Sequence, residues 1–236
     1  MSSTTPFIDS VLLVIRAESG FWPIVGLSLQ VSLLATLIAS ALAIPMAAWL
    51  ALTPFPGRAV IVAALNTFMG LPAVVVGLAV YLLLSRAGPL GSFGLLFTPT
   101  AMVIAEVLLI LPLIAAIARQ VLEQAQREYG TYLRSLGIGK AAMIATLLVE
   151  SRDALLVAVL AGFGRAIAEV GAVMIVGGNI AGVTRVMTTA IALETSKGDL
   201  PLAMSLGSLL LLIVLVVNGL AAWVRARTQR IHGNAT

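Results

Sequence analysis

The 236-residue sequence contains no cysteine and only one histidine, His232. Without cysteine the chain has no disulfide, no thiolate metal ligand and no cysteine nucleophile. Zinc sites and most proton relays rely on histidine or cysteine, so metal cages and catalytic sets of that kind are excluded as well. We therefore expect no resident metal or cofactor in this chain.

The sequence is also poor in charge. Asp, Glu, Lys and Arg together make up 10% of residues, against about 25% in ordinary soluble domains. Hydrophobic residues make up 60%, and the mean hydropathy is +1.10. A soluble globule of this size would have too few charges to cover its surface, so the composition indicates an integral membrane protein and argues against nucleic-acid binding.

Long apolar runs set the expected architecture. A helix needs about 20 residues to cross a bilayer core of about 30 Å. The sequence therefore predicts an all-α integral membrane protein with five transmembrane helices, forming one transmembrane domain over residues 1–236. The expected spans are Ile24–Leu52, Ala59–Leu84, Phe97–Ala118, Leu155–Gly177 and Ala203–Val224.

The segment before the first span, residues 1–20, is too short to cross the membrane. Phe7, Val11, Leu12 and Ile15 fall on one face at helical spacing, which is typical of a helix lying at the membrane interface. Because such a short pattern is weak evidence, a frayed N-terminus remains the alternative.

The placement of Lys and Arg predicts the orientation, because cytoplasmic loops carry an excess of these residues. If successive segments alternate sides, nine basic residues lie on one side and four on the other, with one more inside a span. The nine are Arg58, Arg119, Arg127, Arg134, Lys140, Arg152, Arg225, Arg227 and Arg230. The N-terminus is then outside and the C-terminus inside, so residues 225–236 form a basic cytoplasmic tail.

The stretch 119–153, between the third and fourth spans, is the largest hydrophilic insertion. Apolar residues from Leu122 to Leu136 recur at three- and four-residue steps, Gly137-Ile138-Gly139 breaks the pattern, and a second helical pattern follows. This predicts a helix, a glycine corner and a second helix. The pattern by itself fits either plain extensions of the two spans or a docking element for a soluble partner.

Three ionisable residues fall inside the expected spans: Glu106, Arg165 and Glu169. A charge at the bilayer centre costs at least about 2.5–3.5 kcal/mol, so such residues rarely face lipid. Glu106 and Arg165 both fall near mid-membrane, so they could meet. Arg165 either contacts an anion on a translocation path or belongs to a neutralising network with a structural or gating role, and we favour the second.

Small residues follow a four-residue step on the fourth span, at Ala158, Gly162 and Ala166. Such a stripe permits close helix approach. It suits either packing near a dimer axis or packing against a neighbouring helix of the same chain.

The sequence has no G-x-x-x-x-G-K-[ST] motif. At Gly139-Lys140, Arg134 stands where the first glycine is needed and Ala141 where Ser or Thr is needed. The chain therefore cannot bind and hydrolyse ATP in the P-loop manner, and we expect it not to be an enzyme.

Several stretches resemble a known family. Arg134-Ser135-Leu136-Gly137 resembles the second half of the E-A-A-x-x-x-G signature of ABC-importer permeases, with Thr131, Tyr132 and Leu133 at the E-A-A positions. Further stretches resemble the sulfate/molybdate/tungstate permeases, and most of all the tungstate type. These are 71–78, 85–91, Phe163–Ala172, Gly178–Arg185 and Glu194–Leu200.

The resemblance implies a function and a set of partners. The family's signature segment forms a coupling helix seated on the ATPase, which points to seven residues here: Tyr132, Leu133, Arg134, Ser135, Leu136, Gly137 and Gly139. The implied protein is a homodimeric permease for a tetrahedral oxyanion, in a prokaryotic cell (inner) membrane. Two ABC ATPase subunits would carry the ATP, and an extracytoplasmic oxyanion-binding protein would deliver the substrate.

Two other classes remain open. One is an ion-gradient-driven secondary transporter that uses Glu106 and Glu169 as coupling carboxylates. The other is a structural or assembly protein of the membrane without transport.

Overall fold

A computed structural model describes residues 20–233, with side chains up to Ala226. These residues form nine α-helices and one short 3-10 helix, without a strand among them. The predicted all-α class is thereby confirmed. The interfacial helix predicted over residues 1–20 falls, apart from Gly20, outside the described residues.

Three helices are long and apolar enough to cross a membrane: α2 (Phe21–Leu52), α5 (Pro99–Ser135) and α10 (Leu200–Gly233, over its stretch Leu200–Ala226). Pro45 lies inside α2 and Pro112 inside α5 without interrupting either helix. Thr98 caps α5, and its Oγ1 accepts a hydrogen bond from the Ala101 backbone N–H at 3.4 Å.

The expected single helix over Ala59–Leu84 is instead two helices, α3 (Arg58–Met69) and α4 (Ala73–Leu84), bent at the break. The sequence predicts only a kink at Pro72. Proline has no N–H to continue the helix and disfavours helical backbone at the preceding residue, here Leu71. Gly70 ends α3, so the two residues before the proline also leave the helix.

The expected helix over Leu155–Gly177 is likewise broken, into α7 (Arg152–Ile167) and α8 (Gly171–Gly177), which are also bent at the break. The prediction of one continuous helix was therefore wrong. No proline in the sequence marks this break. The side chains that satisfy the interrupted backbone are described with the site. The structure therefore has three uninterrupted candidate spans, or five if each bent pair counts as one.

The chain divides into two compact units. Unit 1, as described, comprises residues 20–35, 72–107 and 165–216. Unit 2 comprises 36–71, 108–164 and 217–233. Helices α2, α5, α7 and α10 each contribute residues to both units, and the single permease domain stays a prediction.

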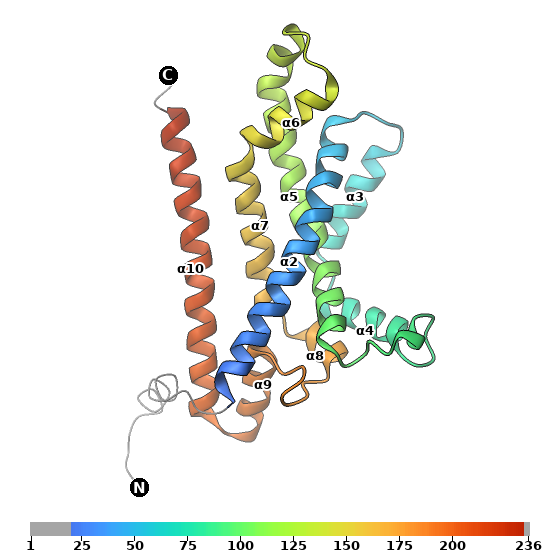
Figure 1. The fold of residues 1–236 in the computed structure, drawn as a ribbon, viewed down its shortest axis with the longest axis vertical. Coiled ribbons are helices and arrows are strands. Elements are labelled where there is room, and N and C mark those ends of the chain that lie inside the picture. The colour runs from blue at the N-terminus through green and yellow to red at the C-terminus, as the bar shows by residue number, and fades with distance from the viewer. Residues whose placement is uncertain (1–19, 234–236) are drawn as a thin grey trace. The chain divides into compact units, whose positions relative to one another are not determined.

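Unit 1 contains α4, α8, α9 (Met187–Lys197) and the 3-10 helix Gly91–Phe93. Helix α4 packs directly on α8 (Figure 1). Gly77 makes this packing possible, because a Cβ there would lie 2.7 Å from the Ala172 Cα. The backbone N–H of Phe97, just before α5, donates a hydrogen bond to the Val176 carbonyl of α8 at 2.9 Å.

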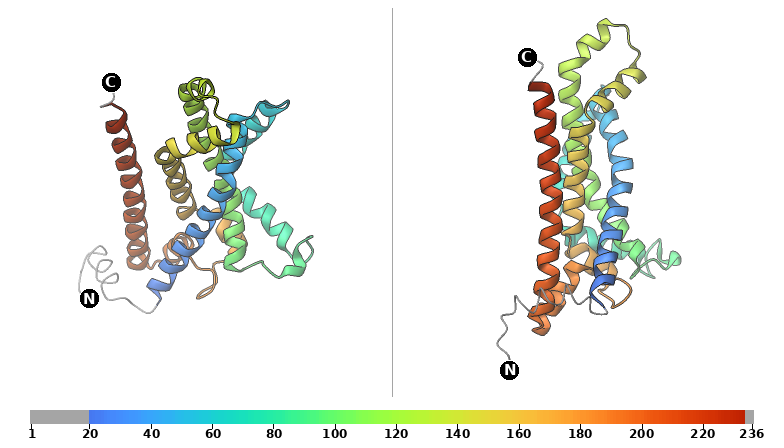
Figure 2. Two further views of the ribbon diagram at one scale, coloured as in Figure 1. Left: turned by 45° about the horizontal axis from the view of Figure 1, so that its top comes forward. Right: turned by 60° about the vertical axis from the view of Figure 1, so that its left-hand side comes forward.

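Unit 2 contains α3, α6 (Lys140–Glu150) and most of α7. Its core is an apolar cluster from α2, α5, α6 and α7, whose fully buried members include Leu122 and Leu147. A smaller cluster joins Val157 of α7 to Ala221 and Val224 of α10. The chain reverses direction between α5 and α6 (Figure 2), as the glycine corner predicts.

Candidate coupling and intramembrane sites

The corner between α5 and α6 is a well-formed Schellman motif. Gly137 has φ +71°, and its N–H donates to the Arg134 carbonyl at 3.0 Å. The next N–H, of Ile138, reaches back to the Leu133 carbonyl at 3.4 Å, and Ile138 packs against the cluster that contains Leu133. The predicted left-handed glycine is confirmed, while Gly139 has φ −65° and precedes α6.

The two faces of this corner differ sharply. Leu133, Met143 and Leu147 point inward and are buried in the core of unit 2. Tyr132 is 64% exposed and Leu136 57% exposed. At 1.5 Å per residue, Tyr132 lies about 21 Å along the helix beyond Ala118, the end of the apolar run. Large apolar side chains this far past the apolar run indicate a protein contact rather than lipid.

Six of the seven residues predicted for ATPase coupling are exposed at the corner. Leu133 is the exception, since it belongs to the core. The others are exposed and surround the corner: Tyr132, Arg134, Ser135, Leu136, Gly137 and Gly139. A docking surface here is consequently supported from below by the packed side of α5 and α6.

The three intramembrane charges belong to unit 1. An ion pair joins Arg165 Nη1 to Glu169 Oε2 at 2.6 Å, one helical turn apart in sequence. Glu169 is almost fully buried, with 4% of its side chain exposed, whereas Arg165 is 44% exposed within the chain. The carboxylate is therefore fixed inside unit 1 and the guanidinium lies at its surface.

Glu169 also repairs the break between α7 and α8. Its Oε1 accepts a hydrogen bond from the Ala172 N–H in the first turn of α8, at 3.2 Å. Its own carbonyl accepts one from Thr188 Oγ1 at 2.7 Å. Because buried backbone groups need partners, this one residue stabilises a bend that would otherwise leave donors and acceptors unpaired.

Glu106 lies close by but is bound differently. Ser32 Oγ donates a long hydrogen bond of 3.5 Å to its Oε1, and its buried Oε2 has no hydrogen-bond partner among the described residues. No ion pair links Glu106 to Arg165, both of which are described. The direct contact between Glu106 and Arg165 that their similar depth allows is therefore not formed.

Glu106 and Glu169 share a small internal cavity of about 10 Å³. Ser28, Ser32 and Thr188 complete its polar lining. This volume is close to the minimum for one water molecule. The site therefore holds no space for an oxyanion inside the chain itself.

The small-residue stripe on α7 is buried within the chain. Ala158 is fully buried and Ala166 is 2% exposed. A Cβ on Gly162 would lie 2.5 Å from the Cδ1 of Ile114 on α5. Gly162 thus packs against a neighbouring helix of its own chain, the second of the two alternatives that the sequence allows.

The sequence reasoning missed the hydroxyl residues around the charges. Ser28 accepts a hydrogen bond from the Met187 N–H at 2.7 Å and so joins α2 to α9. A signal was present, because Ser28, Ser32, Thr36 and Ser40 follow a four-residue step along α2 and are all buried. Among the side chains described, those of residues 20–226, no three His, Asp or Glu gather into a metal site.

The known proteins most usefully compared with this chain are all named as transport permeases. No family model matches the sequence. The probable anion ABC transporter permease protein of Haloferax volcanii is 41% identical, over 89% of this chain and 93% of its own. The tungstate uptake system permease protein TupB of Peptoclostridium acidaminophilum is also 41% identical, over 90% and 93%. The molybdenum transport system permease protein ModB of Escherichia coli is 30% identical, over 75% and 82%.

Proposed function

From the premise that this chain belongs to the family of ABC transporter permeases that includes tungstate, molybdate and sulfate uptake proteins, we propose that it forms the membrane pathway of a tungstate importer. Permease subunits of this family are not catalytic, and ATP is hydrolysed by a separate ATPase. The protein is accordingly an integral membrane transport subunit.

One observation carries the choice of tungstate. The two relatives named as tungstate permeases are 41% and 40% identical to this chain, whereas those named for molybdenum or sulfate uptake are 29–31% identical. Tungstate, molybdate and sulfate are all tetrahedral dianions, so the distinction rests on this gap in identity rather than on a binding pocket in the chain.

We infer five membrane spans, with α3–α4 and α7–α8 each acting as one bent span. Broken helices cross membranes where neighbouring protein satisfies the freed backbone groups, as Glu169 and Thr188 do here. The excess of Lys and Arg on one side gives an external N-terminus and a cytoplasmic C-terminus. A prokaryotic cell membrane is the location that suits such an importer.

The α5–α6 corner is the proposed seat of the ATPase. Its exposed Tyr132 and Leu136 lie on the side with the excess of basic residues, and a rigid helix–turn–helix transmits force better than a loose loop. One ATPase docks on each of two permease copies, and an external binding protein delivers the anion. The homodimer is proposed from the resemblance to ABC-importer permeases, since one chain has a single α5–α6 corner and seats one ATPase.

The Arg165–Glu169 pair is proposed to fix or gate the bent fourth span. Both carboxylate oxygens of Glu169 make contacts inside the chain, which supports a structural role. Arg165 is proposed to share this structural role through its ion pair with Glu169. The anion is proposed to pass along another part of the pathway surface.

The test is uptake by cells that do or do not make this chain, with labelled tungstate, molybdate and sulfate each supplied alone. Loss of the chain should abolish high-affinity tungstate accumulation and leave sulfate accumulation unchanged. Depletion of ATP should stop uptake, while a protonophore applied at constant ATP should not. Unchanged tungstate uptake without the chain would refute the substrate, and uptake that follows the ion gradient would refute the ABC mechanism.

A further inference from the structure

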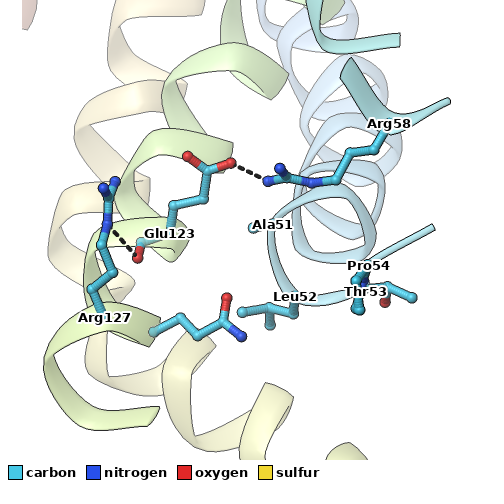
Figure 3. A pocket seen from close by; sticks show the side chains of 8 residues that line it. Ala51, Leu52, Thr53, Pro54, Arg58, Glu123 and Arg127 are labelled. Carbon is cyan, nitrogen blue, oxygen red and sulfur yellow. Dashed lines mark hydrogen bonds and ion pairs between the residues drawn. The ribbon is translucent and has the colours of Figure 1, made fainter. Parts of the chain in front are cut away.

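Unit 2 contains a groove at the junction of α2, α3 and α5 that the transport role leaves unused. It has a volume of about 420 Å³. One side is apolar and includes Leu52 and Pro54, and the other is polar and includes Gln126 and Arg127. Figure 3 shows Arg58 and Arg127 on either side of Glu123.

The charges of this groove do not balance. Glu123 Oε1 is bound by two guanidinium groups, those of Arg58 and Arg119. The Arg127 Nε makes only a long hydrogen bond of 3.4 Å, to the Glu123 backbone carbonyl. Among the lining residues, Arg58 and Arg127 outnumber the Glu123 carboxylate, which leaves a charge of about +1 at neutral pH, because arginine remains protonated in proteins. The buried Arg119, outside the lining, adds a further positive charge beside Glu123.

Arg127 lies at the edge of the groove and has unused donors. Apart from the bond of its Nε, Arg127 has no partner among the described residues, and it is exposed. Helix α3, which begins at Arg58, has no side-chain cap and no acidic residue in its first turn. The N–H groups of Arg58 and Val60 already bond the Phe55 and Gly57 carbonyls, so this helix adds only the field of its positive N-terminal end to that of the arginines. An arginine fork and a helix N-terminus both suit a phosphate group.

The position of the groove points to the membrane interface. Arg119 directly follows the apolar run that ends at Ala118. Trp49 stacks on Phe55 with ring centroids 4.3 Å apart and is 48% exposed, as is typical of aromatic residues at headgroup level. An apolar wall beside a cationic wall is the arrangement that the glycerol and phosphate parts of a lipid require.

We propose that this groove binds a phosphate group supplied by an anionic phospholipid of the cytoplasmic leaflet, with Arg127 and Arg58 as its ligands. The assignment to the cytoplasmic leaflet rests on the orientation given under the proposed function. The binding itself does not, since it depends only on residues of unit 2. Basic pockets beside membrane helices bind anionic headgroups in this way.

The test uses the purified full-length chain in detergent, with bound lipids counted by native mass spectrometry. Dioleoylphosphatidylglycerol and dioleoylphosphatidylcholine are titrated separately, and sodium phosphate serves as a competitor. Arg127→Gln should lower phosphatidylglycerol affinity about fivefold, the effect expected for one arginine near an anionic surface. Arg127→Lys, which keeps the charge and loses the fork, should fall between the variant and the wild type.

Arg152→Gln is the matched control, because it removes the same charge from a side chain that is 76% exposed and lies outside the groove. Its lipid affinity should equal that of the wild type. Thermal unfolding in detergent with added dioleoylphosphatidylcholine should be the same for Arg127→Gln and the wild type, since Arg127 is exposed.

Several results would overturn the proposal. Equal losses in Arg127→Gln and Arg152→Gln would show a general charge effect, and no loss in Arg127→Gln would remove the site. Displacement of the lipid by millimolar sodium phosphate would assign the groove to a free anion instead. Weaker ATPase co-purification in Arg127→Gln, with lipid binding unchanged, would assign it to the ATPase. None of these measurements uses transport, so they are independent of the tungstate assay.

Discussion

At the scale of single residues, the Arg165–Glu169 pair shows how a membrane protein uses a buried charge. Glu169 holds Arg165 with one oxygen and the α8 backbone with the other. Replacing it therefore affects an ion pair and a helix end together. Arg165 lies at the surface of unit 1, so its replacement tests the ion pair without removing the hydrogen bond to α8.

Arg165→Leu should reduce the yield of assembled protein, because it strands the Glu169 carboxylate. Breaking a buried pair costs about 3–5 kcal/mol, and the exposed guanidinium places this case near about 3 kcal/mol. Arg165→Leu combined with Glu169→Gln should recover part of the loss, since the amide oxygen still accepts the Ala172 N–H. Assembled yield and tungstate uptake are the measurements.

Glu106→Gln is the control for this rescue. Because Glu106 makes no ion pair with Arg165 in the described structure, its neutralisation should not restore Arg165→Leu. A stable, fully assembled Arg165→Leu protein with weakened anion uptake, unaffected by either carboxylate change, would instead identify Arg165 as an anion ligand.

At the scale of the element, the α5–α6 corner depends on one backbone conformation. Gly137→Val places a β-branched residue at φ +71°, which costs at least about 1–2 kcal/mol. The variant should insert into the membrane normally but lose ATPase co-purification and transport. Gly139→Ala is the control and should behave like the wild type, because alanine adopts φ −65° without strain. Normal transport in Gly137→Val would contradict the coupling role.

The contact between α5 and α7 gives a second prediction at this scale. Gly162→Ala drives a methyl group into Ile114, and overpacking of this kind costs about 1–3 kcal/mol. Its melting temperature in detergent should fall, and Ile114→Val should restore part of the difference. Gly164→Ala is the matched control, because nothing lies within 4 Å of a Cβ there. An unchanged oligomeric state in Gly162→Ala would support the contact within the chain over one at a dimer axis.

At the scale of the whole molecule, the absence of cysteine makes topology directly measurable. Single cysteines at Ser92 and Thr131, both exposed, should react from opposite sides of the membrane. In intact cells an impermeant maleimide should label Ser92→Cys, and Thr131→Cys only after the membrane is opened. Labelling of both positions from the same side would contradict five spans with an external N-terminus.

The sequence by itself determined the class of this protein, because 10% charge and long apolar runs admit no soluble fold. It also determined the glycine corner, since a helical pattern followed by Gly137 is a local signal that needs no tertiary contact. The kink at Pro72 was visible for the same reason, although its extent was not.

Only the tertiary structure decided where the fourth span breaks and what its charges do. The residues from Ala168 to Val170 carry no local helix breaker, and the bend is stable because Thr188, distant in sequence, supplies a donor to it. Likewise, the four-residue spacing of Arg165 and Glu169 favours their pairing, but only the tertiary structure decides whether Glu106 joins them. That choice depends on helix rotation and packing, which arise only when all the helices assemble.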